Sequence, residues 1–134
     1  MEILVADAFE ELVLLLARIL ETKGYSVVGA TSYDQALRLS MSCRPQVALL
    51  DCEMISSKGV AAFQSMEEAN PGVKLILASN FHEPPYFAGM GKVAAFLVKP
   101  FRVVELLAIL ESLVSPRAWM VSAGQAQRGS STRN

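Results

Sequence analysis

Four polar residues stand where short apolar runs of the sequence end. Asp7 and Asp51 supply carboxylates, Ser79 supplies a hydroxyl and Lys99 supplies an ammonium group. Two carboxylates can hold a hard divalent cation such as Mg²⁺ through oxygen. One of them can attack phosphorus, while the lysine and the hydroxyl neutralise the phosphoryl oxygens. The residue types therefore suit phosphoryl chemistry, if the fold brings them together. The apolar runs are 2–6, 47–50, 73–78 and 94–98.

The run before Asp51 is the clearest strand signal in the chain. Four apolar residues lead without a polar break into Asp51, and Ser57 and Gly59 follow as turn formers. A short continuous apolar run bounded by turn signals is typical of a strand buried on both faces of a parallel sheet. Asp51 would then lie at the carboxyl end of the strand, where open α/β sheets place their chemistry. Taken alone, Asp51 could also merely cap the following turn.

Amphipathic helices are predicted between the apolar runs. Gly24 is expected to end the first helix as its C′ residue. Ser32 with Gln35 has capping-box spacing, which opens a helix through about Met41 after a strand over 25–30. Residues 80–92, with Pro84, Pro85, Gly89 and Gly91, leave room for only a short helix. The apolar faces expected on the first, third and last helices are Leu12, Leu15, Leu16, Ile19 and Leu20; Val60, Phe63 and Met66; and Val103, Leu106, Leu107, Leu110 and Leu113.

Strands that alternate five times with helices predict parallel βαβ units with right-handed crossovers. We therefore expect a three-layer α/β sandwich around a doubly wound, five-stranded parallel sheet. The carboxyl ends of parallel strands meet at one edge of the sheet. Asp7, Asp51, Ser79 and Lys99 are accordingly expected to converge there, although they lie far apart in the sequence.

Composition limits the class of protein. With 134 residues, 52% hydrophobic and 19% charged, the chain is expected to form one well-cored domain over residues 1–114. Residues 115–134 lose all periodicity, hold three arginines and no acid, and are predicted to be a flexible tail. The remaining 9 basic and 13 acidic residues make an acidic body, which argues against nucleic-acid binding. We expect no membrane span, and the two cysteines favour a reducing, cytoplasmic location.

Residues 2 to about 114 resemble the receiver domain of two-component response regulators. Lys99-Pro100-Phe101 reproduces the family's K-P-F/Y signature after a strand, and Met54 and Gly59 match the loop that follows the family's aspartate. The resemblance implies the CheY-like, flavodoxin-like fold with strand order 2-1-3-4-5.

The resemblance also implies a role for each site residue. Asp51 is expected to be the phospho-acceptor. Asp7, Asp51 and the backbone carbonyl of Glu53 are the expected Mg²⁺ ligands. Ser79 and Lys99 are expected to bind the phosphoryl group at a solvent-facing strand end, and Phe96 is the aromatic whose rotamer follows the switch.

The sequence departs from the family pattern at three positions near Asp51. The family usually has two adjacent acids after the first strand, but Ala8 follows Asp7 here. Ile55 replaces the usual proline of the loop, and Lys58 replaces a frequent aspartate and is expected to bring positive charge to the pocket mouth. Mg²⁺ binding is therefore expected to be weak.

Two functions follow from these observations. The first is a receiver that takes a phosphoryl group from a histidine kinase or phosphotransfer protein. It would signal through contacts with an output protein, and a homodimer is one form that such contacts could take. The chain could also be a fragment of a longer regulator. The second is a degenerate pseudo-receiver that acts as a phosphorylation-independent interaction module. An enzyme on a flavodoxin-like scaffold has little support, because no nucleophile–base pair or cofactor loop is visible.

Overall fold

The computed structural model describes residues 2–55, 57–80 and 93–114. The chain divides into two compact units, Met1–Phe101 and Arg102–Asn134. The short helix predicted within 80–92 and the tail predicted from 115 lie outside the described residues, apart from Asn80.

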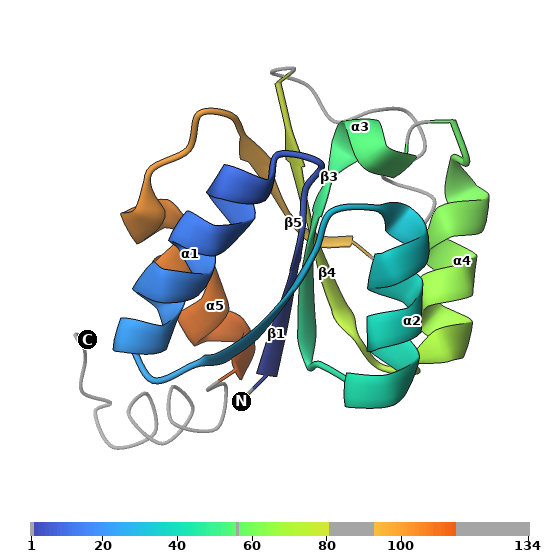
Figure 1. The fold of residues 1–134 in the computed structure, drawn as a ribbon, viewed down its shortest axis with the longest axis horizontal. Coiled ribbons are helices and arrows are strands. Elements are labelled where there is room, and N and C mark those ends of the chain that lie inside the picture. Colours follow the sequence, from blue (N-terminus) through green and yellow to red (C-terminus); the bar gives the residue numbers. More distant parts are fainter. Residues whose placement is uncertain (1, 56, 81–92, 115–134) are drawn as a thin grey trace, which may run out of the picture. The chain divides into compact units, whose positions relative to one another are not determined.

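A five-stranded parallel sheet forms the centre of the first unit (Figure 1). The order β2-β1-β3-β4-β5 is the predicted one. All five residues of β3 are buried, as its apolar run predicts for a central strand. Figure 1 shows the carboxyl ends of the strands at the top of the view, so one edge collects the residues that follow them. The strands are β1 (Glu2–Ala6), β2 (Ser26–Ala30), β3 (Val47–Asp51), β4 (Lys74–Ser79) and β5 (Val93–Val98).

Helices cover both faces of this sheet. In Figure 1, α1 packs on one face, while α2 and α4 lie side by side on the other. The short α3 falls directly after Asp51, where the sequence indicated only a turn. The second unit contributes α5 to the described residues, with Leu106 and Leu110 buried along the predicted stripe. The helices are α1 (Glu10–Thr22), α2 (Tyr33–Cys43), α3 (Cys52–Ile55), α4 (Val60–Ala69) and α5 (Val103–Val114).

The predicted end of α1 and the predicted start of α2 are confirmed, whereas α2 runs to Cys43, two residues past the expected Met41. Gly24 has a φ of 94° directly after the C-cap of α1. Its N–H donates to the Glu21 carbonyl, and that of Tyr25 donates to Leu20, the pattern of a Schellman motif. At the start of α2 the Ser32 hydroxyl accepts from the Gln35 N–H at 3.1 Å. The Gln35 side chain reaches back to the N–H of Thr31, one residue before the position a capping box uses.

The predicted apolar face of α1 was wrong in one respect. Leu16 and Leu20 are buried as expected, but Leu15 is 55% exposed and Val13 is buried in its place. The reason lies in β2, where Gly29 has no side chain. A Cβ at Gly29 would lie 2.6 Å from Cγ1 of Val13. The Val13 side chain therefore occupies the space that a side chain at position 29 would need. This close approach selects the Val13 side of a helix that is apolar on several sides.

Candidate functional site

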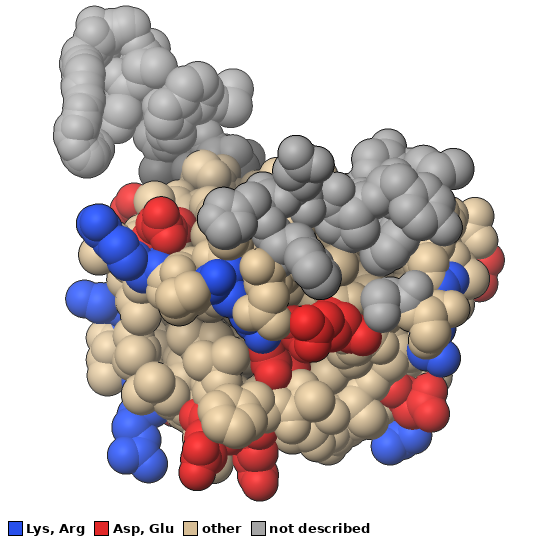
Figure 2. All heavy atoms as spheres, turned by 90° about the horizontal axis from the view of Figure 1, so that it is seen from above, with Lys and Arg blue, Asp and Glu red and all other residues tan. Residues whose placement is uncertain are grey.

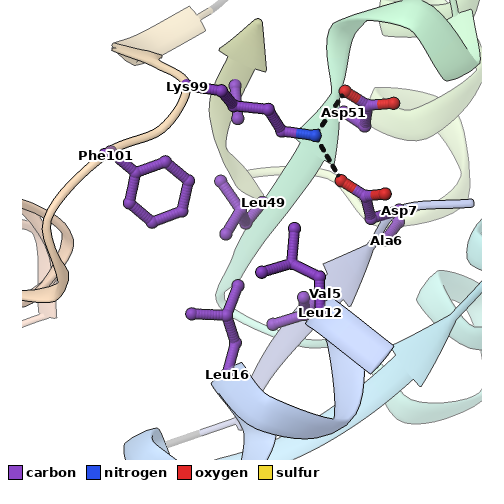
Figure 3. Close-up of a pocket in the computed structure, with 10 residues that line it drawn as sticks. Val5, Ala6, Asp7, Leu12, Leu16, Leu49, Asp51, Lys99 and Phe101 are labelled. Carbon is purple, nitrogen blue, oxygen red and sulfur yellow. Dashed lines mark hydrogen bonds and ion pairs between the residues drawn. The ribbon is translucent and has the colours of Figure 1, made fainter. Parts of the chain in front are cut away.

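Three of the predicted site residues meet at the carboxyl edge of the sheet. Asp7 follows β1, Asp51 ends β3 and Lys99 follows β5. The Lys99 ammonium lies between the two carboxylates (Figure 3), with Nζ 2.5 Å from Oδ2 of Asp7 and 3.0 Å from Oδ1 of Asp51. The first contact joins residues 92 positions apart in the sequence, and the second joins residues 48 positions apart. The strand order alone therefore brings the two acids and the lysine to one point.

Backbone contacts fix the positions of Asp7 and Lys99. The Asp7 N–H donates to the Ala30 carbonyl at 3.1 Å, and Oδ1 of Asp7 accepts from the N–H of Phe9 at 2.9 Å. This second bond turns the chain from β1 into α1 and leaves Oδ2 for Lys99. The Lys99 N–H donates to the carbonyl of Ser79 at 2.6 Å, which continues the β4–β5 pairing by one residue.

Burial and the ion pairs of Lys99 act against each other in this cluster. The side chains of Asp7 and Asp51 are each 9% exposed. Desolvation raises the pKa of Asp51, although the hydrogen bond and charge of Lys99 oppose the rise. Burial alone would lower the pKa of Lys99, but its bonds to Asp7 and Asp51 outweigh that effect and raise it. Lys99 is thus held as a cation. The sequence led us to expect a solvent-facing side chain at this strand end, but the Lys99 side chain is only 17% exposed.

Ser79 ends β4 at the carboxyl edge, whereas Phe96 lies inside β5, two residues before that strand ends. Ser79 is completely buried, and a side-chain hydrogen bond joins it to the thiol of Cys52. Its predecessor Ala78 is the register partner of Asp51, so Ser79 stands one residue beyond the acceptor position on the neighbouring strand. Phe96 pairs with Leu77 and packs, half-buried, against the apolar core on the side of α2 and α4.

Glu53 lies in α3, two residues after Asp51. Its Oε2 accepts a hydrogen bond of 3.0 Å from Nδ2 of Asn80, which follows β4. The carboxylate of Glu53 is thus engaged by Asn80 at the carboxyl edge. Its backbone carbonyl remains the atom that the resemblance assigns to the metal.

The two aspartates fit a hard cation with few protein ligands. Their oxygens converge on one point, where the Lys99 ammonium now lies. Mg²⁺ accepts one or two carboxylates and keeps several waters, which suits such a pair. In the described part of the chain, no group of three or more acidic, histidine or cysteine side chains is arranged to hold a metal ion.

A narrow pocket lies below the ammonium group (Figure 3). Its volume of about 10 Å³ has room for about one water molecule, which is too small for an organic substrate. It is lined mostly by apolar side chains of β1, β3 and α1, with Lys99 and Asp51 at its rim. The lining residues are Val5, Ala6, Asp7, Leu12, Leu16, Leu49, Asp51, Ala78, Lys99 and Phe101.

Three contacts near the site were not anticipated from the sequence. Cys52 is the partner of Ser79, and Asn80 is the partner of Glu53. The third concerns Lys58, whose ammonium lies 5.3 Å from the centroid of the Tyr33 ring, whereas the sequence pointed it toward the pocket mouth. The two residues of each contact lie at least 25 positions apart in the sequence, so no local sequence pattern could have paired them.

The face that carries the site holds both acidic and basic side chains near its middle (Figure 2). Figure 2 looks onto the carboxyl edge and shows acidic atoms gathered there beside basic ones. Asp7 after β1, Asp51 at the end of β3 and Glu53 in α3 supply the acids at this edge. Separately, none of the helices within 2–55, 57–80 and 93–114 is long and apolar enough to cross a membrane.

Solved structures share this fold. A receiver domain protein described as CheY-like, from Methanospirillum hungatei, has a TM-score of 0.76 at 23% identity, covering 87% of this chain and 96% of that one. A response regulator from Burkholderia pseudomallei, crystallised with a phosphorylated aspartic acid and a calcium ion, has a TM-score of 0.72 at 23% identity. That match covers 96% of this chain and 75% of the other.

Curated relatives and a family model complete the comparison. The transcriptional regulatory protein CpxR of Escherichia coli is 27% identical over 98% of this chain and 56% of its own length. The transcriptional regulatory protein PrrA of Mycobacterium tuberculosis is 29% identical over 86% of this chain and 50% of its own. The chain thus spans about half the length of these relatives. Residues 3–111 match the response regulator receiver domain, and the chain belongs to that family.

Proposed function

We propose that this chain accepts a phosphoryl group on Asp51 from a histidine kinase or phosphotransfer protein and passes the signal on through protein contacts. The observation that carries the proposal is the placement of the Asp51 carboxylate. It ends the most buried strand, lies 3.0 Å from a retained cation and shares that cation with Asp7. A carboxylate so placed can act as a nucleophile beside a group that neutralises the incoming phosphoryl oxygens.

The proposed step is a simple displacement. An oxygen of Asp51 attacks phosphorus, an acyl phosphate bond forms, and the bond from phosphorus to the donor's leaving atom breaks. The leaving group takes the electron pair of that bond and, where its basicity requires, a proton from water. Lys99 turns from the carboxylates toward the new phosphoryl oxygens and remains an ammonium ion. A divalent cation held by Asp7, Asp51 and the Glu53 carbonyl would neutralise the remaining charge.

Ser79 is proposed to bind the same phosphoryl group, because it follows the register partner of Asp51 on the neighbouring strand. Its hydroxyl now bonds the Cys52 thiol and is completely buried. The half-buried Phe96 is proposed to repack as β4 adjusts to the phosphoryl group. We assign this receiver to residues 1–114 and propose that 115–134 form an extension without a role in the reaction.

A solved neighbour supports the chemistry. The Burkholderia pseudomallei response regulator carries a phosphorylated aspartic acid and a calcium ion on a similar fold. The same two groups are proposed here at Asp51 and at the converging aspartates, with Mg²⁺ as the metal.

The test is an acetyl phosphate reaction followed by intact mass measurement. Wild type with acetyl phosphate and Mg²⁺ should gain one phosphoryl mass, and Asp51→Asn should gain none. Asp34→Asn is the matched control, since Asp34 lies in the first turn of α2 and should not alter the adduct. An adduct that survives in Asp51→Asn overturns the assignment.

The second candidate is a pseudo-receiver that binds its partners without phosphorylation. Ala8 removes one acid from the site, and Lys99 already occupies the space between the other two. The absence of any adduct in wild type, with partner binding unchanged in Asp51→Asn, would favour this candidate.

A further inference from the structure

Lys58 makes a contact that the proposed phosphoryl chemistry does not use. Its ammonium lies over the ring of Tyr33, 5.3 Å from the ring centroid. An ammonium group within about 6 Å of an aromatic centroid is attracted by the ring's negative face. Within the described residues both salt bridges belong to Lys99, so Lys58 pairs with the ring and not with an acid of the site.

Tyr33 is a fixed support. It begins α2 and is 7% exposed. Its hydroxyl donates to the carbonyl of Ala62 in α4 at 2.8 Å. The ring is therefore held between α2 and α4, which lie side by side. A side chain resting on this ring is tied to the helix layer of the first unit.

Lys58 closes the segment that follows Asp51. Cys52 and Ile55 anchor this segment in the apolar core. The N–H groups of Lys58 and Gly59 both donate to the Ile55 carbonyl, at 3.0 and 3.1 Å, which folds the chain back before α4. Glu53, whose carbonyl is the proposed metal ligand, lies between these anchors.

Two side-chain contacts hold this segment from outside, one at each end. Asn80 bonds the Glu53 carboxylate from β4, and Tyr33 receives Lys58 from α2. The site has few charged ligands because Ala8 stands beside Asp7. Cation binding therefore depends more on a carbonyl that is already in place before the cation arrives.

We propose that Lys58 is a positioning residue, which fastens the described residues 52–55 and 57–59 to Tyr33 and so sets the place of the Glu53 carbonyl beside Asp51. The inference rests on the proposed function, since that function needs a cation at Asp51. This positioning role is the opposite of the one expected from the sequence, in which the Lys58 charge lies at the pocket mouth and repels the cation. A repelling charge would weaken Mg²⁺ binding, whereas a fastened segment strengthens it.

The experiment separates these two roles by the sign of one change. Mg²⁺ is titrated into wild type, Lys58→Met and Lys58→Arg, with binding followed by NMR. Amide hydrogen exchange over 52–59 is measured without metal. Lys23→Met, an exposed residue at the far end of α1, controls for the loss of one charge.

Lys58→Met should bind Mg²⁺ about two- to fivefold more weakly and exchange its 52–59 amides faster by a similar factor. Lys58→Arg keeps a cation for the ring and should stay within about twofold of wild type. Lys23→Met should match wild type. Equal or tighter Mg²⁺ binding in Lys58→Met overturns the proposal, and so does a loss that Lys58→Arg fails to restore.

A failure of the proposed function gives a different result. If wild type shows no response to Mg²⁺, the receiver chemistry fails at its cation, and the exchange measurement alone decides the role of Lys58. Unchanged exchange over 52–59 in Lys58→Met then overturns the proposal. Faster exchange, restored in Lys58→Arg, supports it independently of phosphorylation.

Discussion

Replacing Lys99 by methionine should destabilise the protein strongly at neutral pH and much less in acid. Methionine keeps most of the length of the side chain but removes the charge that Asp7 and Asp51 share. Contacts of 2.5 and 3.0 Å are each worth roughly 6 kcal/mol in gross Coulomb energy at an effective dielectric constant of about 20. Desolvation of the three groups offsets most of this energy.

The net loss comes from leaving two nearly buried carboxylates without a cation. Removing one partner of a buried pair costs about 3–5 kcal/mol, and some exposure at this edge reduces the expected loss to about 2–4 kcal/mol. The comparison is made by urea unfolding of wild type, Lys99→Met and Lys74→Met at pH 7. Lys74 is exposed at the start of β4 and serves as the control for charge and size.

The pH dependence has a definite sign. The raised pKa of Lys99 means that its stabilising charge is present throughout the range below its unfolded value. Burial already raises the pKa of Asp51 in the folded state, and losing Lys99 raises it further. The folded variant therefore binds more protons than the unfolded chain as pH falls, and its deficit shrinks toward pH 4.5. An equal loss at pH 7 and pH 4.5 would show that packing, not charge, is what Lys99 supplies.

Three further substitutions test other parts of the structure. Ala8→Asp should bind Mg²⁺ at least several-fold more tightly by NMR titration, because an added anionic ligand is worth roughly 1–4 kcal/mol at partly exposed separations; unchanged binding would mean that another oxygen already serves. Gly29→Ala should lose about 1–3 kcal/mol in urea unfolding, since its Cβ would lie 2.6 Å from Val13, and adding Val13→Ala should recover part of the loss. Asn70→Ala should lose about 1–3 kcal/mol, because its buried side chain donates to the Pro45 carbonyl at 2.6 Å; full stability in that variant would refute the assignment of this bond.

The strands could be predicted from the sequence because each is an apolar run with a clear end. The predicted strands 2–6, 25–30, 73–78 and 94–98 differ from the observed strands by at most one residue at either end. Strand order and the meeting of Asp7, Asp51 and Lys99 follow from the family resemblance together with parallel topology. The strands, their order and the convergence of the site residues follow from the alternation of apolar runs and helices along the whole chain.

Features that depend on one close contact could not be predicted. α3 has four residues, too few to display a helical period. The buried face of α1 is set by Gly29, which lies on another element, so apolar spacing alone favoured Leu15 over Val13. The side-chain partners at the site could not be predicted for the same reason, because each partner lies on another element. Nothing near Lys58 in the sequence indicates Tyr33, and nothing near Glu53 indicates Asn80.

The central claim is that Asp51 is the residue that takes the phosphoryl group, and chemical trapping tests it most directly. The protein is treated with acetyl phosphate and Mg²⁺, then with sodium borohydride, which reduces an acyl phosphate to an alcohol. Peptide mass spectrometry locates the reduced residue. We predict homoserine at position 51 alone, with Asp7 and Glu53 intact and no homoserine when acetyl phosphate is omitted. Homoserine at position 7 or elsewhere, with Asp51 unmodified, would contradict the account.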